Sequence, residues 1–185
     1  MKNDFAFLVR TLTLFGGLFF SSFKTQQELT PVQLDWDSHF MAEPDEHSAY
    51  AALTATTWQY RYSSTIRGNR LNIDFKFAGG IEPEKSWVKK NRIRDKRQSR
   101  ELLNHEQGHV YINFMQLKEG EYKMRNQKYT IGNYKRLIQT TANSISKYYS
   151  DMQSRYDNET KHGSDLTAQA KWDSFLRSEM NKYQQ

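Results

Sequence analysis

The residues best suited to chemistry form the pentapeptide His105-Glu106-Gln107-Gly108-His109. If this segment is helical, the two histidines lie one turn apart on the same face, so both imidazoles can reach one ion. Zinc binds neutral imidazole nitrogens, and a catalytic zinc site keeps one coordination position open. Glu106 projects beside the first histidine, where it can reach a water bound to the ion. The spacing therefore predicts a zinc hydrolase site with Glu106 as the general base.

A third ligand must come from elsewhere in the chain, because two histidines hold zinc poorly. Residues 126–150 contain no acidic side chain that could reach the ion from a second helix. The next cluster of ligand-type residues is 156–163, in which His162 precedes a glycine and so suits the end of a helix. We expect His162 to be the third ligand, and Asp157 and Glu159 are the alternatives.

Composition excludes several classes of protein. The chain has 185 residues, a formal net charge of +6 and no cysteine, which rules out disulfides, thiolate nucleophiles and cysteine-based metal sites. Residues 85–100 carry eight basic side chains against one acid, Asp95. This run is either a solvated surface or a contact for an anionic envelope polymer. We expect no nucleic-acid partner, because no recognisable binding module is present.

The first 23 residues predict export. Residues 11–23 are uncharged and follow a short basic start, and 13 residues suit a signal-peptide core better than a membrane span. An uncleaved membrane anchor is the alternative. We expect the protein to contact a membrane only in that case. We therefore expect a signal peptide over 1–23, a linker over 24–33 and a single domain over 34–185. The mature protein would be periplasmic or secreted.

An antiparallel β-hairpin is predicted for the first half of the domain. Residues 54–65 are rich in β-branched and aromatic side chains, and residues 70–78 alternate strictly between apolar and polar. Arg67-Gly68-Asn69 between them is a turn signal, and Gly79-Gly80 is expected to end the second strand. The segment 86–88 could add a short further strand.

The second half of the domain is predicted to be helical. Apolar residues recur at helical spacing in three segments, which are 99–118, 132–156 and 164–183. The first of these helices carries the two histidines of the pentapeptide. Strands followed by helices in separate blocks indicate an α+β domain.

Several segments together resemble a bacterial family of predicted secreted zinc-dependent proteases, which is otherwise a domain of unknown function. The most specific are the His-Glu-Gln-Gly-His core and the segment YDNETKHG at 156–163. The resemblance implies an exported, zincin-like α+β domain with His105, His109 and His162 as metal ligands. One departure is Val110-Tyr111-Ile112, which stands where the family more often has an aromatic-acidic-apolar triplet. The other resembling segments are 34–36 with Phe40, 49–62, 86–88, 102–112, Gln169 and Trp172.

These observations predict an exported metallopeptidase with one Zn²⁺ per chain and a peptide or protein substrate. Glu106 would accept a proton from a zinc-activated water, and Tyr156 would donate a hydrogen bond to the developing oxyanion. A core position for Tyr156 is the alternative. Two other functions share the same residues: hydrolysis of cell-wall peptides, and a non-catalytic envelope-binding module that retains the metal site.

Overall fold

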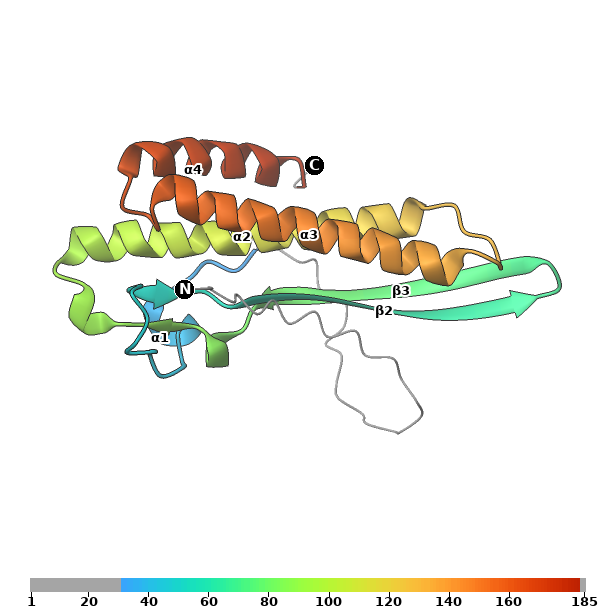
Figure 1. The fold of residues 1–185 in the computed structure, drawn as a ribbon, viewed down its shortest axis with the longest axis horizontal. Helices are drawn as coiled ribbons and strands as arrows, with labels where there is room; N and C mark the ends of the chain where they lie inside the picture. The colour runs from blue at the N-terminus through green and yellow to red at the C-terminus, as the bar shows by residue number, and fades with distance from the viewer. Residues whose placement is uncertain (1–30, 184–185) are drawn as a thin grey trace.

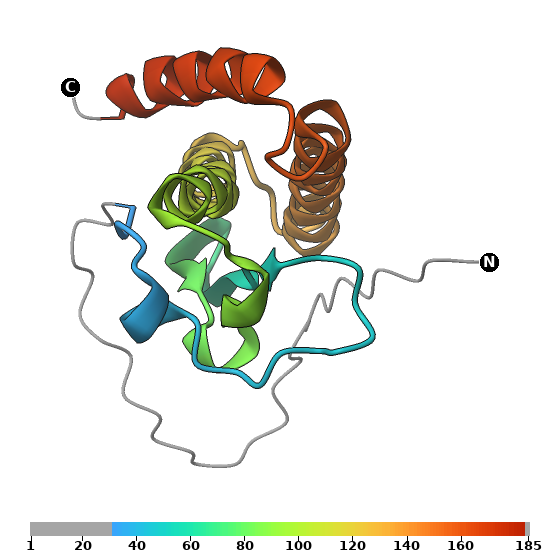
Figure 2. The same ribbon diagram turned by 90° about the vertical axis from the view of Figure 1, so that its left-hand side faces the viewer.

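A long β-hairpin lies along two antiparallel helices, and a third helix covers the opposite side of that helix pair (Figures 1 and 2). The structure is a computed structural model and describes residues 31–183. The α+β prediction, with a hairpin followed by three helices, is confirmed. The elements are α1 (Trp36–His39), β1 (Ala52–Leu53), β2 (Thr56–Arg67), β3 (Arg70–Ile81), β4 (Trp87–Val88), α2 (Lys96–Asn126), α3 (Tyr134–Thr160) and α4 (Leu166–Asn181), with 3₁₀ turns at Pro83–Lys85 and Lys90–Arg92.

The hairpin is longer than the sequence pattern indicates. Strands β2 and β3 pair in antiparallel register from Thr56 opposite Ile81 to Arg67 opposite Arg70. Gly68 in the turn has a φ of 56°, a conformation in which glycine avoids the Cβ clash of other residues. The expectation that Gly79-Gly80 ends the second strand is wrong. A Cβ at Gly79 would lie 2.7 Å from the carbonyl oxygen of Thr57, so glycine here lets the paired strands approach closely.

One face of the hairpin is buried against the helix pair. Phe75 of β3 is 4% exposed and packs with Met124 of α2 and Ile138 of α3. Leu71, Ile73 and Phe77 belong to the same face and are partly buried against this cluster. The apolar alternation of β3 therefore places the hairpin under α2 and α3. The predicted short strand is also present, because β4 pairs with β1.

Helix α2 extends beyond both predicted ends and α3 beyond its predicted C-terminal end, whereas α4 is two residues shorter than predicted at each end. Helix α2 begins after Asp95, whose carboxylate accepts hydrogen bonds from the backbone N–H groups of Arg97 and Gln98. Helix α4 begins in the same way after Asp165, which caps the N–H of Ala168. The additional turns of α2 are mostly polar, so they leave no apolar period in the sequence by which to recognise them.

The three long helices share one core cluster, which includes Ile112 of α2, Met152 of α3 and Leu176 of α4. Among the helices described within residues 31–183, none is long and apolar enough to cross a membrane. The signal peptide or anchor expected over 1–23 and most of the linker expected over 24–33 lie outside the described residues.

Candidate metal centre

Three histidine rings gather around the carboxylate of Asp157. Two of them come from α2, and the third comes from the turn that follows α3. The distances to Asp157 Oδ1 are 3.2 Å from His105 Nε2, 3.1 Å from His109 Nε2 and 3.5 Å from His162 Nδ1. The ring centroids of His105 and His162 lie 6.4 Å apart. The fold therefore brings together the three histidines that were predicted as ligands from separate segments of the chain.

Asp157 is part of the group best arranged to hold a metal ion. One ligand atom from each of His105, Asp157 and His162 lies within 4.8 Å of the others. His109 contacts the same carboxylate from the side, although it does not belong to this compact set. Glu159 points elsewhere, because its carboxylate accepts a hydrogen bond of 2.8 Å from the indole of Trp172. Of the three ligand candidates in 156–163, the structure thus places two at the site.

A positive charge next to Asp157 Oδ1 would stabilise this carboxylate. This oxygen is buried and accepts no hydrogen bond of acceptable geometry, although three imidazole nitrogens surround it. A buried carboxylate oxygen without a partner is costly. Two ligands of a tetrahedral zinc lie about 3.3 Å apart when each is about 2.0–2.1 Å from the ion. The contacts of 3.1–3.5 Å to Asp157 are therefore compatible with neighbours around one ion.

The charges of the site are strongly coupled. Burial opposes protonation of His109, but the adjacent Asp157 carboxylate outweighs burial and raises the pKa of His109 to about 9. Burial also opposes ionisation of Asp157, yet the nearby His105 and His109 hold the pKa of that carboxyl well below its ordinary value. Burial is the main reason that the pKa of His162 is lowered. A proton on His109 can thus supply the positive charge that Asp157 requires.

His162 reaches the site from an unusual backbone turn. Lys161, His162 and Gly163 have φ values of 50°, 52° and 79°, so three consecutive residues are left-handed. Non-glycine residues adopt this region at a cost of about 1–2 kcal/mol each. Gly163 is required for the approach to α2, since a Cβ there would lie 2.8 Å from the Cβ of His105. The side chain of His162 is 40% exposed, so the histidine group opens to solvent on this side.

Glu106 lies in a buried position next to His105. It is 4% exposed, and its Oε2 accepts a hydrogen bond of 2.6 Å from the hydroxyl of Thr54. Thr54 lies between β1 and β2, so this bond ties the base of the hairpin to α2. Sequence reasoning did not find Thr54, because an isolated threonine beside a strand carries no distinctive signal. It also missed Tyr50, whose ring centroid lies 4.3 Å from that of His162.

The expected role of Tyr156 as an oxyanion donor does not agree with its position. Its hydroxyl donates to the carbonyl oxygen of His105 at 2.9 Å and accepts from Gln169 Nε2 at 2.8 Å. The residue is 0% exposed, and its ring stacks on the His105 ring at 4.7 Å. A hydroxyl enclosed in this way does not face a substrate. Tyr156 is instead the core tyrosine that the alternative interpretation described, and it fixes α3 against α2.

Gly108 permits this contact between α2 and α3. A Cβ at position 108 would overlap the hydroxyl and the ring carbon Cζ of Tyr156. We expect Gly108→Ala to lower the free energy of unfolding by about 1–3 kcal/mol, because overpacking must separate the helices. Urea denaturation followed by circular dichroism measures the change. Gly132→Ala is the matched control, since nothing lies within 4 Å of a Cβ at that position. Equal stability of Gly108→Ala and the wild type would contradict the close packing.

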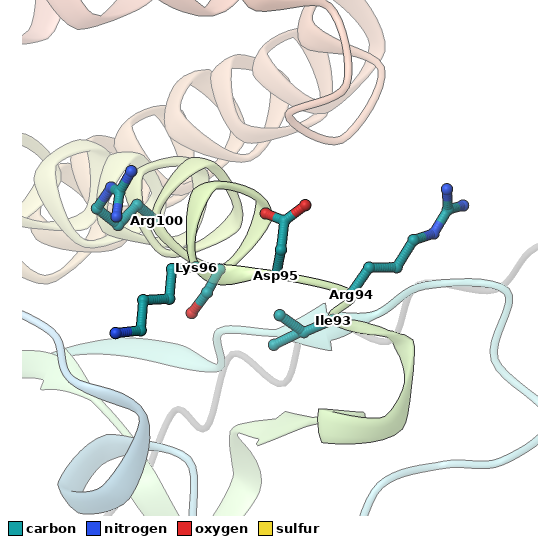
Figure 3. A pocket seen from close by; sticks show the side chains of 6 residues that line it. Ile93, Arg94, Asp95, Lys96 and Arg100 are labelled. Atoms are coloured by element: carbon teal, nitrogen blue, oxygen red, sulfur yellow. The ribbon is translucent and has the colours of Figure 1, made fainter.

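The basic run leads into the start of α2. A hollow of about 420 Å³ at the start of α2 contains Arg94, Lys96 and Arg100 in its lining. Figure 3 shows that these three cationic side chains point in different directions. Lys89 is 2% exposed and donates to the carbonyl oxygen of Ser48, so part of the run is structural. An anionic envelope polymer as partner stays a prediction.

The fold and the site define a class: an α+β domain with a buried group of histidines and one aspartate that could hold a metal ion. The chain belongs to the bacterial family of unknown function DUF922, whose model matches residues 28–163. The match covers the hairpin, the whole of α2 and α3, and the His162 turn. The chain thus belongs to a bacterial family, as expected, but the description of this family assigns no protease activity. No curated protein and no solved structure matches the chain.

Proposed function

We propose that this chain is a zincin-like metal-dependent hydrolase, most specifically a metallopeptidase, with one Zn²⁺ per chain. His105, His109 and His162 would be the three ligands, which leaves a fourth position open for a water. The Asp157 carboxylate, which contacts all three rings, would lie beside the ion. The observation that carries the proposal is the buried Asp157 Oδ1, which has three imidazole nitrogens around it at 3.1–3.5 Å. A divalent cation at this point would accept the lone pairs of the three rings and balance the negative charge of the carboxylate beside it.

The donor set favours zinc among the common metals. Imidazole nitrogens and a carboxylate oxygen are regular zinc ligands, whereas magnesium and calcium prefer oxygen donors alone. When bound, zinc supplies a Lewis acid and lowers the pKa of a water to about 7. His105 is 2% exposed, so the site would hold its ion in surroundings that strengthen electrostatic interactions.

Glu106 is the proposed general base. Thr54 occupies its Oε2, which leaves Oε1 as the oxygen that can take up a proton. The hydrogen bond from Thr54 also restricts the rotation of the carboxylate, so the base is held in place beside His105. Glu106 would accept a proton from the attacking water and pass it to the leaving amine of the cleaved amide. Export, predicted from residues 1–23, would bring the enzyme to peptide or protein substrates of the cell envelope.

The metal content of the purified protein tests the proposal. After purification without chelator, we expect one zinc per chain in the wild type and in His47→Ala, which alters an exposed histidine that is not among the proposed ligands. His162→Ala should weaken zinc binding by about 100-fold or more, because a ligand matters at least as much as its supporting residues. Chelator competition measures both affinities.

The outcomes separate the parts of the proposal. A wild-type protein that binds no zinc would refute the metal centre. If the wild type binds zinc and His162→Ala binds it equally well, His162 is not a ligand. Asp157→Ala, measured in the same way, shows whether the carboxylate contributes.

A further inference from the structure

We propose that Gln153 and Gln169 are positioning residues that set the tautomers of the two helix histidines. Each glutamine would accept the Nδ1–H of one ring, so that both rings present the lone pair of Nε2 to the same ion. This inference rests on the proposed metal centre and adds to it the residues that orient its ligands. Neither glutamine contacts the ion in this arrangement.

The orientation of the Gln169 amide follows from its other partners. Its Nε2 donates to Asp173 Oδ1 at 2.7 Å and to the Tyr156 hydroxyl at 2.8 Å. An ionised carboxylate only accepts, so the NH₂ end of the amide must face Asp173. The Oε1 end therefore faces His105 Nδ1, at 3.2 Å. Since an amide oxygen cannot donate, the proton between them belongs to His105 Nδ1.

Thr160 supports the same assignment. Its hydroxyl lies 3.4 Å from His105 Nδ1, but it donates its hydrogen to the carbonyl oxygen of Tyr156 at 2.7 Å. The hydroxyl oxygen can therefore only accept from the ring. Both polar neighbours of His105 Nδ1 are acceptors, and the lone pair of the neutral ring is left on Nε2, which faces Asp157.

Gln153 repeats this arrangement on α3. Its Oε1 lies 2.6 Å from His109 Nδ1, and its Nε2 donates to the carbonyl oxygen of the same histidine at 3.1 Å. The two bonds fix the amide, because a carbonyl oxygen also only accepts. His109 therefore keeps its proton on Nδ1 and presents Nε2 to the metal position.

Helix α4 supports the site through Gln169 and Asp173. Asp173, which orients Gln169, also accepts a hydrogen bond of 2.9 Å from Asn104 Nδ2 on α2. A chain of hydrogen bonds thus runs from α2 through α4 and back to His105. Such outer partners fix ring orientation and raise ligand basicity, and their loss usually weakens metal binding by about 10–100-fold.

Substitutions of Gln153 distinguish a positioning role from a packing role. Gln153→Met keeps the length of the side chain but removes the acceptor, and we expect zinc affinity to fall by about 10–100-fold. Gln153→Glu keeps an acceptor for Nδ1–H, so its affinity should stay close to the wild type or exceed it. Gln139→Met, on an exposed position of the same helix, is the matched control and should change nothing. Chelator competition measures all four proteins.

The ring protons provide a second readout. In the zinc-loaded wild type with ¹⁵N-labelled histidine, long-range ¹H–¹⁵N spectra should show the remaining proton of His105 and His109 on Nδ1. Gln169→Met should weaken zinc binding as Gln153→Met does, and circular dichroism checks that it folds. If it does not fold, the Gln153 series and the spectra decide.

Two results would overturn the inference while leaving the metal centre intact. One is equal zinc affinity of Gln153→Met and the wild type. The other is coordination of His109 through Nδ1. A wild-type protein that binds no zinc would refute the proposed function and this inference with it.

Discussion

Replacing Glu106 by glutamine is expected to lower kcat for peptide hydrolysis by about 10²–10⁴-fold, the usual contribution of a general base. Glutamine keeps the size of the side chain and can still contact Thr54, but it cannot accept a proton. Zinc content should stay at one per chain, because Glu106 is not among the proposed ligands. The measurement is the cleavage rate of casein and of purified peptidoglycan by zinc-loaded wild type and variant.

A second glutamate on α2 serves as the control. Glu101→Gln removes a surface carboxylate whose ion pair with Arg97 spans 3.8 Å, and it should leave the rate unchanged. Cleavage of peptidoglycan without cleavage of casein would assign the site to cell-wall peptides. If Glu106→Gln cleaves as fast as the wild type, Glu106 is not the base. If the wild type cleaves neither substrate, the non-catalytic binding module gains support.

The stability of the metal-free protein is expected to fall as the pH rises from about 6.5 to 9. The pKa of His109 is raised from 6.5 to about 9 in the folded protein. The protonated ring therefore stabilises the fold fully below its unfolded pKa, and this stabilisation is lost as the pH passes through the folded pKa. The loss amounts to about 3 kcal/mol at most, from 1.36 kcal/mol for each pKa unit.

Urea denaturation at several pH values, with chelator present, measures this change. The lowered pKa values of Asp157 and His162 act at lower pH, so they do not account for a loss in this range. Asp157→Asn is the control, since it removes the charge that holds the proton and should flatten the dependence. Zinc affinity should rise over the same range, because the ion displaces the proton. A flat stability profile for the wild type would contradict the coupling of His109 to Asp157.

Local periodicity explains why much of the site could be predicted. The relation between His105 and His109 depends only on the helical repeat, which the apolar stripe of α2 indicates. The hairpin could be predicted equally well, because β3 alternates strictly between apolar and polar residues and follows a turn that contains Gly68. Both features are encoded within short segments of the chain.

The third ligand depends on long-range packing, so sequence spacing left it open between His162, Asp157 and Glu159. In the structure, His162 and Asp157 lie beside the helix histidines. Glu159 instead accepts a hydrogen bond from Trp172. Tyr156 shows the same limit. Its spacing from His162 places it near the site, but the packing of three helices turns its hydroxyl toward a backbone carbonyl. Thr54 is a further case, because only the folded chain shows what its hydroxyl contacts.

The end of the family match has a practical consequence for cloning. The match stops at residue 163, so a fragment cut there would retain every proposed ligand. It would nevertheless lack α4, and with it Gln169 and Trp172, which bond to Tyr156 and Glu159. The buried face of α3 would then meet water. A recombinant fragment that ends where the family match ends would therefore lack the residues that support the candidate metal centre. A recombinant protein should extend at least through Asn181.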